Sequence, residues 1–480
     1  MSKQSRAQSP SLTRRGGTGQ PRVLAAPVVA SALALGLLLV SPSAGAAPGL
    51  PTADQDTVAT IDVGTCPYNG AIDTAKKRLY VANNEDGTVS VIDTRINSVI
   101  STITVGQKPN TPVIDAARNR VYVRNFASNS VSVIDTGTNA VVANVTVGTS
   151  PMTPALDSTR ARLYVPNSGS RSVSVVDVNT NAVVATIPVS DGPRTPAIDE
   201  PRAKMFVPNE DANSISVVDL NTLTAVATVP VGKSPRLPVV DPTTARVYVP
   251  NFRGSSVTVL DATNYAVVAT IPVGNNPWNP VLDAARKRLY VVNAESDSVS
   301  VIDTTTNTVI SSIKVGTEPW GSAYDADHYR LYVSNNDADT VSVIDTASNA
   351  VVATLPTGSY PLSPEIDPGL GRLYVTNCES NDVSVLKIRT EFPPAAPQGL
   401  RITKAAGSSA TLAWSAPAWA GSSKVSGYVV KATPGGRTCK TTKRSCTITG
   451  LKAGTRYVFE VRATNRYGPG TPAKTNAASW

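Results

Sequence analysis

A tripeptide of the type Leu-Tyr-Val recurs eight times in this chain at a constant spacing of 42 residues. The eight copies begin at Leu79, Val121, Leu163, Met205, Val247, Leu289, Leu331 and Leu373. An asparagine stands two residues after each copy, at Asn83, Asn125, Asn167, Asn209, Asn251, Asn293, Asn335 and Asn377. A fixed period of this length indicates repeated copies of one supersecondary unit, in which each copy covers the apolar surface of its neighbour.

Each unit contains four short stretches that are rich in β-branched residues and bounded by Gly, Pro, Asn or Asp. In the second unit these stretches are residues 111–115, 120–125, 130–135 and 140–147. Four strands per repeat predict an all-β fold, an eight-bladed β-propeller. The segment 58–63 reads as a fourth strand without a blade, and the last copy stops at its third strand. We therefore expect the N-terminal strand to complete the last blade and leave no open sheet edge.

The segments "RLYVANNEDGTVSVIDT" (78–94) and "RLYVVNAESDSVSVIDTTTNTVISSIKVG" (288–316) resemble the YVTN family of propeller repeats. The resemblance extends over residues 57–388. It implies the propeller fold and says little about function.

The chain changes character after a Pro-rich linker at residues 389–396. Residues 397–480 resemble a fibronectin type III domain, with Trp414 and Tyr428 as core aromatics and Leu451 with Tyr457 in the tyrosine-corner pattern. The fold prediction is thus a propeller followed by a β-sandwich.

Charge divides the chain in the same place. Residues 47–396 hold 26 Lys and Arg against 34 Asp and Glu, whereas residues 397–480 hold 13 against Glu460 alone. The formal charges are therefore −8 and +12, from the differences of those counts. A basic domain of this kind predicts attachment to an anionic surface such as a cell-wall polymer, or docking on the acidic propeller itself. The sequence argues against a nucleic acid partner, because the basic residues lack interleaved aromatics and the expected compartment is extracellular.

The first 46 residues read as a secretory signal peptide, with basic residues, an apolar run and the pattern Ala44-x-Ala46 before the cleavage site. An uncleaved membrane anchor is the alternative. Cleavage predicts a secreted protein without a transmembrane segment, associated with the cell wall or free.

Four cysteines in an exported chain predict disulfides. Cys66 and Cys378 belong to turns on one face of the closing blade, and a bond between them would lock the ring. Two free thiols are the alternative for this pair. Cys439 and Cys446 flank six residues between two expected strands, which favours a local disulfide.

Two sets of residues repeat in all eight units and are predicted to be architectural. The aromatic of the tripeptide is expected to pack between blades. The Asp that ends each innermost strand, Asp73 and its seven equivalents, is expected to accept turn hydrogen bonds rather than form a carboxylate ring.

Function is expected where the repeats differ. The residue after each "VGxxP"-like proline should face the mouth of the central channel, and its eight versions are Tyr68, Asn110, Met152, Arg194, Arg236, Trp278, Trp320 and Leu362. Glu365 replaces the Ala or Val found at that register in the other seven blades. The ligand-binding candidates are Tyr68, Asn110, Arg194, Arg236, Trp278, Trp320 and Glu365.

Aromatic faces beside guanidinium groups suit a sugar ring, a peptide or an anionic polymer. The alternative is that these side chains simply fill the mouth. The function predicted is therefore an extracellular binding scaffold for a glycan, cell-wall polymer or protein ligand, with no cofactor.

The second functional hypothesis is an extracellular hydrolase or lyase. Some propellers of similar architecture are lactonases or lyases, which use His, Glu or metal-bound water at the mouth. The sole histidine, His328, is expected on the opposite face, and no zinc spacing or catalytic triad is present. Carboxylate or metal-assisted chemistry would then have to use Glu365 with Asn69, Asn110 and Asn279.

Overall fold

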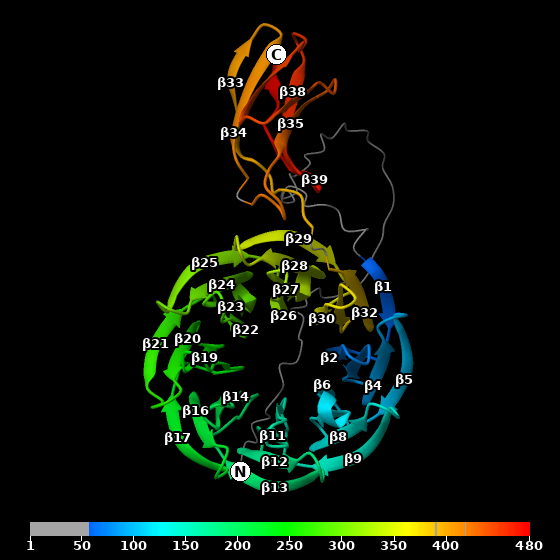
Figure 1. Ribbon diagram of the computed structural model, residues 1–480, viewed down its shortest axis with the longest axis vertical. Helices are drawn as coiled ribbons and strands as arrows, with labels where there is room; N and C mark the ends of the chain where they lie inside the picture. The colour runs from blue at the N-terminus through cyan, green and yellow to red at the C-terminus, as the bar shows by residue number, and fades with distance from the viewer. Residues whose placement is uncertain (1–56, 389–390, 418) are drawn as a thin grey trace, which may run out of the picture. The chain divides into compact units, whose positions relative to one another are not determined.

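The computed structural model describes residues 57–388, 391–417 and 419–480. Eight four-stranded antiparallel sheets follow one another around a ring (Figure 1). The strand that begins each repeat is the one nearest the centre of the ring. The predicted eight-bladed propeller is confirmed. The predicted signal peptide, residues 1–46, lies outside the described residues.

The strands occupy equivalent positions in every blade. The innermost strands are β2 (Pro67–Asp73), β6 (Pro109–Asp115), β10 (Ala155–Asp157), β14 (Ala197–Asp199), β18 (Val239–Asp241), β22 (Pro277–Asp283), β26 (Pro319–Asp325) and β30 (Pro361–Asp367). The second strands are β3 (Arg78–Asn83), β7 (Arg120–Asn125), β11 (Arg162–Asn167), β15 (Lys204–Asn209), β19 (Arg246–Asn251), β23 (Arg288–Asn293), β27 (Arg330–Asn335) and β31 (Arg372–Asn377).

The third strands are β4 (Thr88–Asp93), β8 (Ser130–Asp135), β12 (Ser172–Asp177), β16 (Ser214–Asp219), β20 (Ser256–Asp261), β24 (Ser298–Asp303), β28 (Thr340–Asp345) and β32 (Asp382–Lys387). The outermost strands are β5 (Ser98–Thr104), β9 (Ala140–Thr146), β13 (Ala182–Pro188), β17 (Thr224–Pro230), β21 (Val267–Pro272), β25 (Thr308–Lys314), β29 (Ala350–Pro356) and β1 (Thr57–Asp62). Short 3₁₀ turns are η2 (Ala116–Arg118), η3 (Ala294–Ser296) and η4 (Asn336–Ala338).

The ring closes through β1, which pairs with β32 so that Ile61 lies opposite Val383. The last blade is therefore built from both ends of the propeller sequence, as predicted. The predicted disulfide between Cys66 and Cys378 is present, with a Cα–Cα separation of 3.9 Å across 312 residues of sequence. It joins the turn after β1 to the turn after β31 and so links the two ends covalently.

The repeated asparagine stabilises the corner of each blade. Asn167 donates from Nδ2 to the hydroxyls of Ser172 and Ser174 on the adjacent strand, at 3.3 and 3.0 Å. A Cβ added to Gly148 would lie 2.7 Å from Cγ of Asn167, so the "VG" glycine leaves the space that the asparagine fills. Equivalent Asn bonds recur in the other blades. A glycine faces the asparagine in every blade but the fourth, where Ser190 takes its place.

The apolar core lies between neighbouring blades. Tyr80 is fully buried among Val89, Val91 and Ile103 of its own blade and Val121, Val123 and Ile134 of the next. Each such aromatic removes roughly 150–250 Å² from water. The predicted packing role of this register is confirmed, because its eight members are at most 1% exposed.

The Asp that ends the innermost strand shapes the following turn. Asp157 accepts from the backbone N–H of Arg160 at 2.9 Å and pairs with its guanidinium at 2.9 Å. Asp73, Asp115, Asp241, Asp283, Asp325 and Asp367 accept turn N–H groups in the same way. The turn role predicted for this register is confirmed at these positions.

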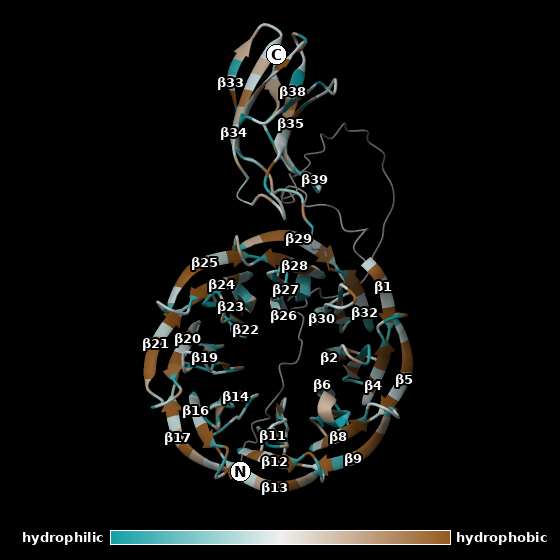
Figure 2. Ribbon diagram, in the orientation of Figure 1, coloured by the Kyte–Doolittle hydropathy of each residue, from teal (hydrophilic) through white to brown (hydrophobic). Residues whose placement is uncertain are grey.

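Hydrophobic stretches of ribbon recur along the outermost strands, interrupted by more polar ones (Figure 2). Val142, Val184, Val226 and Val268 are 44–50% exposed there. Their β-branched side chains suit a strand, but they contribute little to the core.

The C-terminal domain consists of two packed sheets. The first has the order β33 (Gln398–Ala406), β34 (Ser409–Ser415), β37 (Ser445–Thr449). The second has the order β36 (Thr438–Thr441), β35 (Gly427–Thr433), β38 (Arg456–Asn465), β39 (Gly468–Lys474), and β40 (Ala478–Ser479) also pairs with β38.

The sandwich core contains the aromatics that the sequence predicted. Trp414 and Tyr428 are buried with ring centroids 5.4 Å apart. The Tyr457 hydroxyl accepts the backbone N–H of Lys452 at 3.1 Å, which is the tyrosine-corner contact. Cys439 and Cys446 form the predicted disulfide, with Cα atoms 6.4 Å apart. Among the described residues, no helix is long and apolar enough to cross a membrane.

Candidate functional site: the mouth cluster

The innermost strands bring the variable residues together where these strands begin. We call Tyr68, Arg124, Arg194, Glu210, Arg236, Phe252, Trp278 and Trp320 the mouth cluster. The residue two positions after the mouth proline has positive φ at Thr111 (33°), Leu237 (42°) and Asn279 (42°), and a β-bulge interrupts the strand pairing at Thr111 and at Asn279. Non-glycine residues rarely adopt such angles, and functional sites are where this strain concentrates.

Arg194 and Arg236 share one carboxylate. Glu210, whose side chain is 6% exposed, forms salt bridges with both guanidinium groups, and Arg236 Nε donates to its Oε1 at 2.8 Å. The Ser234 hydroxyl donates to the same oxygen at 3.0 Å. Burial alone would raise the pKa of Glu210, but the two arginines outweigh it and hold that pKa below its usual value.

The aromatic residues extend from Arg236. Its guanidinium carbon lies 4.2 Å from the ring centroid of Phe252 and 5.1 Å from that of Trp278. Trp278 in turn stacks on Trp320, with centroids 4.7 Å apart and an interplanar angle of 28°. Trp278 therefore contacts both a cation and a second indole. Within the part of the chain that the structure describes, Trp320 has no further ring partner, and it is partly exposed.

Two further predicted candidates, Tyr68 and Asn110, lie near the starts of β2 and β6. Tyr68 is partly exposed, and burial raises the pKa of its hydroxyl although Arg124, Arg236 and Arg194 act in the opposite direction. Its phenol is therefore neutral and able to donate at pH 7. Asn110 is only 6% exposed and its Oδ1 accepts from the Thr111 hydroxyl at 2.6 Å. The buried Asn110 side chain therefore makes its hydrogen bond within the protein.

Polar groups of neighbouring innermost strands bond to one another around the centre. Asn69 Nδ2 donates to the Thr111 hydroxyl at 2.9 Å, and the Thr153 hydroxyl lies 3.3 Å from the same oxygen. A similar bond joins another pair of neighbouring innermost strands, β22 and β26, where Asn279 Nδ2 donates to the Ser322 hydroxyl at 3.1 Å. These partly exposed amides and hydroxyls retain capacity to bond a polar ligand.

Glu365 is separate from the arginines. Its Oε1 accepts from the Ser363 hydroxyl at 3.0 Å, and a Cβ added to Gly70 would lie 3.4 Å from its Cγ. Burial raises the pKa of Glu365 to about 7, and the Ser363 bond only partly offsets it. The structure therefore places Glu365 at the seam between the last and first blades.

A second carboxyl with a raised pKa lies before β26. Burial, followed by the nearby Asp337 and Asp297, raises the pKa of Glu318 to about 7. Glu318 precedes the mouth proline, a register that the sequence analysis did not consider. Among the described residues no group of His, Cys, Asp and Glu is arranged to hold a metal ion. His328 lies in the turn after β26, where Nδ1 contacts Asp325 Oδ2 at 2.8 Å, away from the mouth as predicted.

Sequence reasoning missed Arg124, Glu210 and Phe252. Glu210 and Phe252 occupy the position after the repeated asparagine, which also varies between blades and includes Cys378. Arg124 occupies the position before that asparagine, where the other blades have Ala82, Pro166, Pro208, Pro250, Val292, Ser334 and Thr376. A charged residue at a register of small or apolar residues was the available signal.

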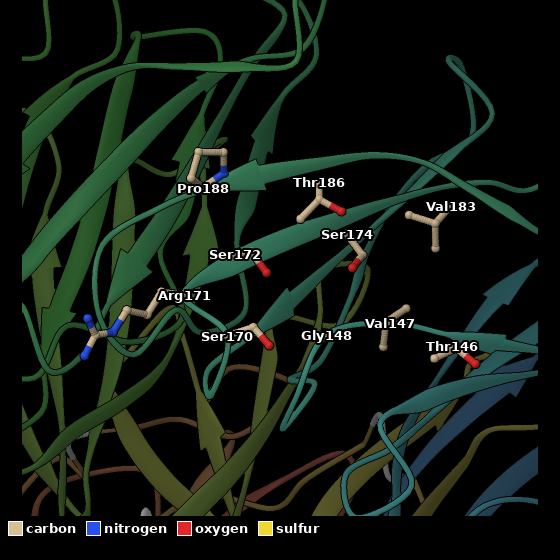
Figure 3. A pocket seen from close by; sticks show the side chains of 10 residues that line it. All are labelled: Thr146, Val147, Gly148, Ser170, Arg171, Ser172, Ser174, Val183, Thr186 and Pro188. Carbon is tan, nitrogen blue, oxygen red and sulfur yellow. The ribbon is translucent and has the colours of Figure 1, made fainter.

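A hollow of about 620 Å³ lies elsewhere, beside β12 and β13 of the third blade (Figure 3). Its lining includes Gly148, Ser170, Ser172, Ser174 and Val183. The guanidinium of Arg171 extends away from the other lining side chains and pairs with Asp191 at 2.9 Å. No unpaired charge marks this hollow among the residues that line it, so it is a weaker candidate than the mouth cluster.

Comparisons with known proteins agree with this architecture. Residues 395–477 match the family model of the fibronectin type III domain. A chain of Kuenenia stuttgartiensis hydrazine synthase is similar at 19% identity, with a TM-score of 0.49 over 67% of this chain and 96% of that one. The dihydro-heme d1 dehydrogenase NirN in complex with DHE is similar at 16% identity, with a TM-score of 0.55 over 72% of this chain and 82% of that one. At such identities the NirN likeness concerns the fold alone.

The two disulfides and the fibronectin domain are consistent with an extracellular protein. A propeller joined to a domain of this family is the architecture of an interaction scaffold. The chain is therefore an eight-bladed β-propeller protein whose residues 395–477 belong to the fibronectin type III family.

Proposed function

We propose that this protein is an exported binding scaffold whose mouth cluster binds an acidic carbohydrate and whose fibronectin domain attaches to an anionic surface. The observation that carries the proposal is the continuous series from Arg194 through Glu210, Arg236 and Trp278 to Trp320. It is assembled from positions at which the repeats differ, whereas the repeated positions build the ring.

Three features of the cluster favour an acidic carbohydrate over a neutral ligand or a peptide. The partly exposed Trp320 offers an aromatic face to a sugar ring. The guanidinium groups suit a carboxylate or phosphate substituent. The amides and hydroxyls of Asn69, Thr111 and Asn279 suit sugar hydroxyls.

The fibronectin domain supplies the surface-binding half of the proposal. Lys431, Arg437, Lys440, Lys443 and Arg444 are all exposed on or beside β35, β36 and β37. The only acidic residue of the domain, Glu460, is paired with Arg462 at 2.7 Å and lies 3.7 Å from Lys474. Exposed cations of this density attract polyanions, and salt screens the attraction.

Co-sedimentation of the full chain with an insoluble acidic polysaccharide and with a neutral one tests both halves. We expect Trp320→Ala to weaken binding at any salt concentration, because ring stacking is insensitive to salt. Lys440→Glu with Lys443→Glu should weaken binding only at low salt. The matched control is Lys233→Glu with Lys314→Glu, which changes two exposed lysines of the propeller. Equal binding of the two polysaccharides would contradict the proposal.

A hydrolase or lyase is the second candidate, and the observation that favours it is the pKa of about 7 for Glu365 and Glu318. A carboxyl with such a pKa is suited to general acid or base chemistry near neutral pH. Turnover of a lactone or uronide that is abolished by Glu365→Gln or Glu318→Gln would support this function. Activity that survives both substitutions and chelation would remove it.

A further inference from the structure

Arg124 is a buried cation without a counter-ion among the described residues. Its side chain extends from β7, and the residue is 8% exposed. Nη1 donates to the carbonyl oxygen of Pro151 in the next blade at 3.1 Å, whereas Nε is buried without a hydrogen-bond partner. A buried guanidinium that is left unpaired costs several kcal/mol. No architectural requirement explains this cost, because the seven equivalent positions carry no charge.

The nearby carboxylate does not compensate Arg124. Glu210 is already shared by Arg194 and Arg236, which leaves this region with three cations and one anion. Burial is the main cause that lowers the pKa of Arg124, and the nearby Arg194 lowers it as well. The pKa of Arg124 is thereby lowered to about 10. Arg124 therefore remains charged at pH 7, and the surplus positive charge persists.

Arg124 and Arg194 contact two adjacent residues of the third blade. Arg124 reaches the Pro151 carbonyl, and Arg194 Nη1 lies 3.5 Å from Sδ of Met152. Both guanidinium groups lie close enough to Tyr68 to lower the pKa of its hydroxyl, although burial outweighs them and the phenol stays neutral. Two cations and a neutral donor are therefore gathered in the region of Met152, which is itself partly exposed.

We propose that Arg124 and Arg194, with Tyr68, bind the anionic group of the ligand, a carboxylate or a phosphate. The inference deepens the proposed function, on which it rests, by assigning the acidic substituent of the carbohydrate to this subsite. The unpaired Nε–H of Arg124 donates to the anion, and the anion neutralises the surplus charge. Trp320, at the far end of the stack, is left to hold the sugar ring.

A thermal-shift titration of the full chain with sodium phosphate and with sodium acetate tests the subsite without any carbohydrate. Sodium chloride at matched ionic strength is the reference. Either anion should raise the Tm of the wild type because it binds the native state preferentially. The increase should be absent in Arg124→Gln and in Arg124→Met, which keeps the apolar stem. Arg253→Gln, which removes an exposed arginine near Arg236, should respond as the wild type does.

Stability in the absence of an added anion distinguishes the proposed role of Arg124 from a merely structural one. Without an added anion, Arg124→Gln should be at least as stable as the wild type, because it removes an uncompensated buried charge. Equal anion-dependent shifts in the wild type and in both Arg124 variants would overturn the inference.

Titration with oligogalacturonate, with a neutral galactose oligomer and with inorganic phosphate then separates the inference from the proposed function. We expect Arg124→Gln to weaken oligogalacturonate binding about tenfold or more and to leave the weak binding of the neutral oligomer unchanged. Unchanged oligogalacturonate affinity in Arg124→Gln, together with a loss in Trp320→Ala, would refute the subsite and keep the carbohydrate function. Phosphate binding that needs Arg124, without binding of either oligomer, would keep the subsite, identify a free anion as its ligand and refute the carbohydrate function.

Discussion

The indole rings of Trp278 and Trp320 stack with centroids 4.7 Å apart, although 42 residues of sequence separate them. The repeat brings equivalent positions of adjacent blades together, so one period in sequence becomes one neighbour in space. In the series of contacts Trp278 lies between Arg236 and Trp320, and Trp320 lies at the end. The two tryptophans, which the sequence treats alike, therefore have different roles.

The stack predicts unequal stability effects. Trp278→Ala removes the contacts with Arg236, Phe252 and Trp320, so it should lower the free energy of unfolding by about 3 kcal/mol. Trp320→Ala removes one ring contact and should cost about 1 kcal/mol. Urea denaturation gives both values, and near-ultraviolet circular dichroism should show loss of the coupled indole signal in either variant. Equal costs would contradict the assigned order.

The shared carboxylate predicts a large effect of a small change. Glu210→Gln leaves Arg236 buried without its anionic partner, so the propeller should lose about 3–5 kcal/mol of stability. Glu85→Gln is the control, because Glu85 and its partner Lys108 are 51% and 43% exposed. Removing such an exposed pair should cost less than about 1 kcal/mol. Chemical denaturation of both variants measures the difference, and a cost of Glu210→Gln as small as the control's would refute the buried pairing.

Glu365 predicts a pH dependence of stability. Burial raises its folded-state pKa from an ordinary 4.5 to about 7, so the folded protein holds this proton more tightly than the unfolded chain. The folded state is then favoured below the unfolded pKa, and this advantage is lost as the pH rises from about 4.5 to about 7. Glu365→Gln should remove this loss, on the order of 3 kcal/mol at most.

Denaturation of Glu365→Gln and the wild type at pH 5 and pH 8 measures this effect. The variant should be the more stable of the two at pH 8, with a smaller difference at pH 5. Glu379→Gln, at an exposed position of the same blade, should follow the wild type at both pH values. A wild-type stability that rises over this window relative to Glu365→Gln would show that the carboxyl is ionised in the fold.

Ring closure predicts the effect of the long-range disulfide. Cys66→Ser with Cys378→Ser releases a loop of 312 residues, so the unfolded chain gains much entropy. The propeller should lose about 2–5 kcal/mol, measured by thermal or chemical denaturation. Cys439→Ser with Cys446→Ser, which opens a loop of 7 residues, should leave propeller unfolding unchanged. A propeller as stable without the first bond as with it would show that β1 and β32 close the ring alone.

Much of the fold was predictable because a propeller is periodic. The spacing of the asparagines fixed the number of blades, and the unmatched strand at residues 58–63 fixed the closing blade. Cys66 and Cys378 then followed from the alternation of turns between two faces. These predictions rest on backbone topology, which the repeat determines.

The mouth cluster was only partly predictable because side-chain directions decide which registers meet. Tyr68, Arg194, Arg236, Trp278 and Trp320 come from the register that the sequence identified. Glu210 and Phe252 reach the same place from the turn after the second strand, and Arg124 reaches it across a blade boundary. The repeat does not reveal such contacts between registers. Arg194 and Arg236 are linked through Glu210, which belongs to another register, so the repeat alone does not predict their link.

Isothermal titration of the full chain with oligogalacturonate tests the central claim most directly, with Trp320→Ala and Tyr329→Ala compared to the wild type. Tyr329 is 45% exposed and follows His328 in the turn after β26, so its loss controls for removal of an exposed aromatic away from the mouth. Saturable binding that falls about tenfold or more in Trp320→Ala and is unchanged in Tyr329→Ala is the predicted result. Binding that is absent from the wild type, or equal in all three proteins, would contradict a carbohydrate-binding mouth.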